Sequence, residues 1–146
     1  MEFKKNKAIY KYIYCDVWKC GISVFIGDNE SLLKWAKKFY TDSEEQDMIM
    51  SIEKHGSENE YREKRVAGRI YESDSGQWII HLPSFSFSYD PVEISNMSHE
   101  ILHAAFLILD FVGMEYMYQG NNEAYTYLQE FLLKNALNKE GYKGIK

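Results

Sequence analysis

The chain has 146 residues, 45% of them hydrophobic and 16% aromatic, and its formal net charge is −5 at pH 7. This size and composition predict one globular domain, 1–146, with room for a proper core. The acidic balance argues against a nucleic-acid partner bound by phosphate neutralisation, and the lack of a long apolar segment argues against a membrane partner.

The N-terminal segment carries lysines but no apolar stretch like that of a signal peptide, because charge interrupts residues 9–12. The two cysteines, Cys15 and Cys20, are too few for a disulfide framework. We therefore expect reduced thiols in a cytoplasmic protein, with a cross-link inside a hairpin as the alternative.

Residues 8–18 and 21–26 are rich in Tyr, Ile and Val, which predicts two strands. Asp28 then predicts the start of a helix, and apolar residues at helical spacing extend it to about Tyr40. The next segment, 42–64, is strongly charged and predicts either a short surface helix with a loop or a flexible insertion. Its thin apolar stripe consists of Met48, Ile49 and Ile52.

Residues 66–72 and 77–82 flank a Ser-Asp-Ser-Gly turn at 73–76, which predicts a hairpin. From 84 to 89, Phe and Ser alternate, and this predicts a strand or another extended segment.

A long helix is predicted to begin after Asp90, because Pro91 stands at its first position and Glu93 at its third. It should run to about Val112, where Gly113 can adopt the left-handed conformation that ends a helix. The helix is apolar almost all round, so we expect it in the centre of the domain.

Within this helix, His99 and His103 are four residues apart, so both imidazoles point to the same side. That spacing suits two nitrogen ligands of one zinc ion, and Glu100 could act as general base towards a metal-bound water. Burying these polar groups in an apolar helix is costly without a partner. A metal would supply one, and a buried hydrogen-bond network is the structural alternative.

A catalytic zinc site needs a third protein ligand. A second helix is predicted from residue 121 or 122 to about Leu137, and its return towards the first helix would bring Glu123 to the histidines. Glu130 and Glu115 are alternative ligands. The plainer interpretation of Glu123 is an acidic residue favoured at a helix N-terminus by the helix dipole.

The His99-Glu100-x-x-His103 pattern, with Glu123 twenty residues after His103, resembles the gluzincin metallopeptidases, which include the thermolysin-like enzymes. The resemblance covers about residues 95–130. It implies a small zincin-like α+β fold, with a few-stranded sheet, one packing helix and two active-site helices. It also implies zinc ligation by His99, His103 and Glu123, with Glu100 as the base. The wider segment looks like small metallopeptidase-like proteins encoded by phages and prophages.

Two features depart from the family. Its Asp four residues after the ligand Glu, which supports the first His, is replaced here by Tyr127, so Asp110 is the candidate to orient a ligand instead. The family's transition-state His from a C-terminal domain has no counterpart, which leaves His81, Tyr125 and Tyr127 as candidates. The strand around His81 would line the cleft and could pair with an extended peptide. An ordinary hydrogen bond is the plainer interpretation of His81.

These patterns predict zinc-dependent hydrolysis of amide bonds in a peptide or protein substrate. The main alternative is a non-enzymatic accessory or structural protein of a phage or prophage on a degenerate zincin scaffold. A weaker alternative is a metal-dependent hydrolase acting on a non-peptide amide. The sequence leaves the substrate and the oligomeric state open.

Overall fold

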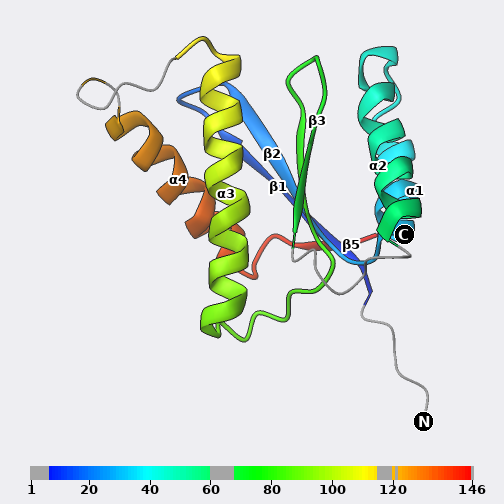
Figure 1. The fold of residues 1–146 in the computed structure, drawn as a ribbon. Helices are drawn as coiled ribbons and strands as arrows, with labels where there is room; N and C mark the ends of the chain where they lie inside the picture. Colours follow the sequence, from blue (N-terminus) through cyan, green and yellow to red (C-terminus); the bar gives the residue numbers. More distant parts are fainter. Residues whose placement is uncertain (1–6, 60–67, 115–119, 121, 146) are drawn as a thin grey trace.

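The computed structural model describes residues 7–59, 68–114, 120 and 122–145. Over these residues the fold is α+β, as predicted, with a five-stranded mixed sheet between two layers of helices (Figure 1). In chain order the elements are β1 (Ile9–Cys15), β2 (Cys20–Ile26), α1 (Asn29–Phe39), the 3₁₀ turn η1 (Ser43–Glu45), α2 (Gln46–Asn59), β3 (Arg69–Glu72), β4 (Trp78–Leu82), α3 (Pro91–Phe111), α4 (Asn122–Leu137) and β5 (Lys143–Gly144).

The strand order across the sheet is β3-β4-β2-β1-β5. β2 and β4 run parallel, and every other neighbouring pair is antiparallel. The two predicted strands at the N-terminus and the predicted hairpin of β3 and β4 are confirmed. The short edge strand β5 was not predicted, because two residues carry no strand pattern.

The sheet separates two layers of helices (Figure 1), and each layer covers its own hydrophobic core. We call the cluster beneath α3 and α4 the α3-side core, and the cluster beneath α1 and α2 the α1-side core. Side chains alternate between these faces along each strand. On β4, Trp78, Ile80 and Leu82 join the α3-side core, whereas Ile79 joins the α1-side core. The same alternation turns His81 to the α1 side.

The predicted helix after Asp28 is confirmed as α1, and the Asp28 carboxylate accepts a hydrogen bond from the backbone of Ser31 at 2.7 Å. The charged segment that follows forms α2, and the apolar stripe of this helix is buried in the α1-side core. The predicted short surface helix is therefore confirmed, with its apolar stripe buried and most of its described polar residues exposed, and the alternative of a flexible insertion is wrong for residues 46–59. A narrow stripe suffices because α2 packs on α1 and the edge of the sheet.

Both ends of α3 form as predicted. Asp90 caps the start by accepting from the backbone of Glu93 at 2.9 Å. At the other end, Gly113 has φ 84° and donates to the Asp110 carbonyl, while Met114 donates to the Leu109 carbonyl. This pair of hydrogen bonds defines a Schellman motif.

The alternating segment 84–89 joins no strand, so the prediction of a strand there was wrong, and the extended alternative fails at Phe87 and Tyr89. The backbone N–H groups of Ser86 and Ser88 donate to the Glu93 carboxylate, at 2.7 and 3.2 Å, rather than to a neighbouring strand. Phe87 and Tyr89 have positive φ angles, which a regular strand does not allow.

Cys15 and Cys20 face each other across the β1–β2 hairpin as free thiols. Burial raises the pKa of the Cys20 thiol to about 11, with a further contribution from Cys15, so Cys20 stays protonated at neutral pH. Among the described residues, no helix combines the length and the apolar composition needed to cross a bilayer.

Candidate metal centre

The two motif histidines lie next to each other on the exposed side of α3. Their Nε2 atoms are 3.2 Å apart, and their ring centroids are 4.7 Å apart with the ring planes at 81°. The two Nε2 atoms are within hydrogen-bond distance, and the tautomers decide which imidazole donates. The four-residue spacing of His99 and His103 on a regular helix is sufficient to produce this arrangement.

The donor geometry fits zinc. Two nitrogens bound to one tetrahedral zinc at the usual length of about 2.0–2.1 Å lie about 3.3 Å apart. The Nε2 atoms of His99 and His103 already have nearly that separation, 3.2 Å. Both side chains are exposed, so the ion and a substrate could reach them from solvent. The helix therefore presents half of a tetrahedral ligand set with little rearrangement.

Glu100, between the two histidines in sequence, points into the protein and is only 7% exposed. Burial raises the pKa of its carboxyl group, and the nearby His99, His103 and Arg69 partly oppose that shift. A carboxyl group with a raised pKa holds a proton more readily than an ordinary glutamate does. That property suits a group that must accept a proton and later release it.

Glu123 lies in the first turn of α4 and is exposed. Its turn lies close to α3, since the Tyr125 ring packs on Phe106 with centroids 5.0 Å apart. Nevertheless, over residues 7–59, 68–114, 120 and 122–145, no three His, Cys, Asp or Glu side chains form a group that could hold a metal ion. The structure thus brings His99 and His103 together but not Glu123, which stays a predicted ligand.

Of the two alternative third ligands, only Glu130 lies among the described residues. Glu130 is exposed, further along α4, and belongs to no metal-holding group among the described side chains. Glu115 lies outside the described residues.

Of the residues proposed for substrate or transition-state contacts, His81 lies on the other face of the sheet. His81 was expected to line the cleft, but it faces the α1 side, where its Nε2 donates to the Gly27 carbonyl at 2.7 Å. Burial lowers its pKa, against the opposing effect of that hydrogen bond, so His81 is neutral at pH 7. The expectation was wrong because side chains alternate between the faces along a strand. Ile80 and Leu82 face the α3 side, so His81 between them faces the α1 side.

The remaining candidates are on α3 and α4. Tyr125 is buried, and its hydroxyl donates to the Met114 carbonyl at 2.8 Å. Tyr127 is 52% exposed and is free to contact a ligand. Asp110 is exposed, two turns beyond His103, and among the described residues no hydrogen bond joins its carboxylate to either histidine. The predicted role of Asp110, orienting a ligand histidine, therefore has no supporting hydrogen bond among the described residues.

The sequence interpretation missed Gly68 and Arg69, at the start of β3. A Cβ added to Gly68 would lie 2.8 Å from both Glu100 Cγ and Leu82 Cδ2, so the glycine leaves the space that the Glu100 side chain occupies. Arg69 donates to His55 Nδ1, and its charge also acts on Glu100. In the sequence, the only indication of this contact is a glycine directly before a strand, and that indication is weak.

Comparison with known proteins yields no match among family models, curated proteins or solved structures.

Proposed function

We propose that this protein is a zinc-dependent peptidase that hydrolyses amide bonds. The observation that carries the proposal is the pair of exposed imidazoles whose Nε2 atoms are 3.2 Å apart, directly beside a buried carboxyl group. Among the described residues, only His99, Glu100 and His103 combine this donor spacing with an adjacent buried carboxyl group. The gluzincin resemblance of the sequence points to the same three residues.

In the proposed reaction, His99 and His103 hold the ion, with Glu123 as the expected third ligand. Zinc, when bound, lowers the pKa of the attacking water and polarises the scissile carbonyl. Glu100 accepts the proton of that water and delivers it to the departing amine. Burial raises the pKa of Glu100, which favours the protonated form that the side chain takes between the two transfers.

The sheet edge beside Glu100 suggests how a substrate would lie. β3 ends the strand order, and Gly68, directly before it, touches the Glu100 side chain. An extended peptide could pair with the outer edge of β3 through backbone hydrogen bonds. Its scissile bond would then pass the histidine side of α3.

The test compares wild-type protein with Glu100→Gln on denatured casein and on a library of quenched fluorescent peptides. We expect the variant to keep its zinc and to lose about 10²–10⁴-fold in kcat/KM, because it cannot accept a proton. Glu30→Gln is the matched control, since Glu30 is in the first turn of α1 on the other face of the sheet. Full activity in Glu100→Gln would contradict the base assignment.

One observation favours a second candidate, a non-enzymatic accessory or structural protein. Among the described residues no third protein ligand joins the histidines. If the folded, zinc-loaded protein cleaves no peptide, and if Glu100→Gln behaves identically, this second candidate replaces the first.

A further inference from the structure

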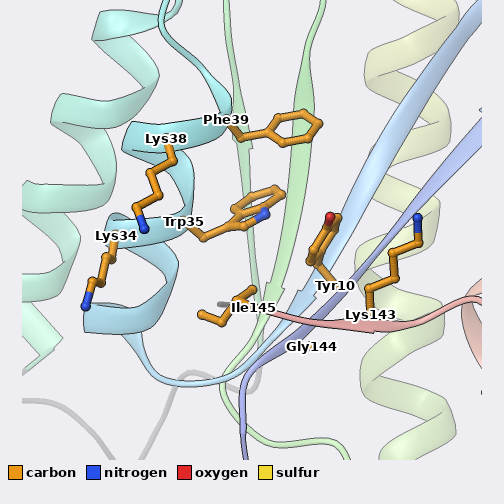
Figure 2. Close-up of a pocket in the computed structure, with 8 residues that line it drawn as sticks. All are labelled: Tyr10, Lys34, Trp35, Lys38, Phe39, Lys143, Gly144 and Ile145. Carbon is orange, nitrogen blue, oxygen red and sulfur yellow. The ribbon is translucent and has the colours of Figure 1, made fainter.

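A second site lies on the opposite face of the sheet from the histidines. It is a cavity of about 460 Å³ between α1 and the β1–β5 edge of the sheet, within the size range of small-molecule pockets. Figure 2 shows three aromatic side chains in its middle and lysines on both sides. The cavity is lined by the aromatic residues Tyr10, Trp35 and Phe39 and by the lysines Lys34, Lys38 and Lys143.

The aromatic residues form one continuous group. The rings of Trp35 and Phe39 are stacked with centroids 5.2 Å apart, and the Tyr10 ring is 5.2 Å from Trp35. Trp35 is nearly buried, whereas Phe39 is 50% exposed, so the group has a buried base and an open face. Such a face can bind a planar ring by stacking.

The lysines give the cavity a positive rim in a chain of net charge −5. Lys34 and Lys38 stand one turn apart on α1, and Lys143 stands across the cavity on β5 (Figure 2). Among the described residues, none of these three has a carboxylate within ion-pair distance. Lys37, by contrast, lies outside the cavity and pairs with Glu53 at 3.0 Å. Unpaired ammonium groups around an apolar cavity favour an anionic occupant.

We infer that this cavity binds a nucleoside phosphate, whose base stacks on the aromatic group and whose phosphates are held by the rim lysines. A nucleoside phosphate combines the two features that the cavity selects, a planar ring and several negative charges. Lysine holds phosphate as a flexible point charge, which matches ammonium groups at a rim rather than in a fixed fork. The inference does not depend on the proposed peptidase activity, because the two sites are on opposite faces of the sheet.

The aromatic surface continues past the cavity. Tyr12 and Tyr14 follow Tyr10 on the same face of β1, are 46% and 47% exposed, and have ring centroids 6.5 Å apart. A longer ligand with several bases could use these rings as well. The test therefore has to separate a mononucleotide from a single-stranded oligonucleotide.

The experiment is calorimetric titration of the full chain with ATP after EDTA treatment, so that phosphate cannot bind a metal at the histidines. We expect ATP to bind, adenosine and inorganic tripolyphosphate to bind at least about tenfold more weakly, and added salt to weaken ATP binding. The double variant Lys34→Ala/Lys38→Ala should lose at least about tenfold in affinity. Phe39→Ala should lose a similar factor, because it removes the exposed ring.

Two control variants make the result specific. Lys37→Ala removes one charge from the same helix outside the cavity, and His99→Ala alters the opposite face, so both should bind ATP as the wild-type protein does. No detectable ATP binding by the folded protein would overturn the inference, as would equal losses in Lys37→Ala and in the double variant. Binding of tripolyphosphate as tight as that of ATP would also overturn it. Tighter binding of an oligothymidylate than of ATP would replace the ligand with a single-stranded nucleic acid.

Discussion

The two faces of the sheet carry different kinds of surface chemistry although the same strands build both. On the α3 side, α3 and α4 cover the sheet, and the outer side of α3 exposes His99 and His103 while Glu100 points into the protein. On the α1 side, the helices leave part of β1 uncovered, and aromatic residues remain exposed beside lysines. Helix cover therefore places the candidate chemistry of one face on the outside of α3, whereas incomplete cover leaves strand residues accessible on the other face.

The largest expected effects test whether both faces belong to one cooperative unit. Leu132 on α4 and Leu32 on α1 are each fully buried, one in each core. We expect Leu132→Ala and Leu32→Ala to lower the free energy of unfolding by about 2–5 kcal/mol each, through lost burial and a residual cavity. Denaturant melts followed by circular dichroism and by tryptophan fluorescence measure this loss.

Both variants should unfold in a single transition that the two probes report identically. A second transition confined to Leu32→Ala would show that the α1 layer unfolds independently of the sheet, and the comparison of the two faces would then fail.

A smaller effect should separate the two sites. In Gly68→Ala, the new methyl group would meet Glu100 Cγ and Leu82 Cδ2 at 2.8 Å, so the Glu100 side chain must shift. We expect about a tenfold loss in kcat/KM, because the base moves relative to the substrate. ATP affinity, measured by calorimetry, should stay unchanged. An equal loss of kcat/KM and of ATP affinity would indicate a general defect in folding.

The smallest effect is a pH dependence of stability. The pKa of Glu100 is raised by burial in the folded protein, so its protonated form stabilises the fold at acidic pH and that contribution is lost as pH rises through the folded pKa. In metal-free protein, Glu100→Gln should therefore unfold at a higher temperature than wild type near neutral pH. The difference should shrink as pH falls below the ordinary carboxyl range.

Thermal melts of both proteins across this pH range test the prediction. A Tm difference that does not change with pH would mean that the charge of Glu100 carries no cost in the folded state.

The sequence predicts much of the fold because its local signals are strong. Asp90, Pro91 and Gly113 mark the ends of α3 through hydrogen bonds and backbone conformations that depend only on neighbouring residues. Where a feature of the fold depends on contacts between residues far apart in the chain, the sequence pattern does not predict it. The burial of α2 depends on α1 and the sheet edge, and the path of residues 84–89 depends on the Glu93 carboxylate.

The same distinction holds at the candidate site. The convergence of His99 and His103 follows from helical spacing alone, so the sequence predicts it. The face of His81 depends on the register of β4 with β2, and the position of Glu123 depends on how α4 docks on α3. Neither is encoded locally. Gly68 was missed because its contact with Glu100 joins residues far apart in the chain.

The proposed metal centre is tested by the zinc content of the purified, untagged protein, measured by mass spectrometry together with that of His99→Ala and Glu123→Ala. We expect about one zinc per chain, with sharply reduced binding in both variants because each removes a ligand. Unchanged zinc in Glu123→Ala would contradict only the third ligand. No zinc in the wild-type protein, even after reconstitution at neutral pH, would contradict the metal centre itself.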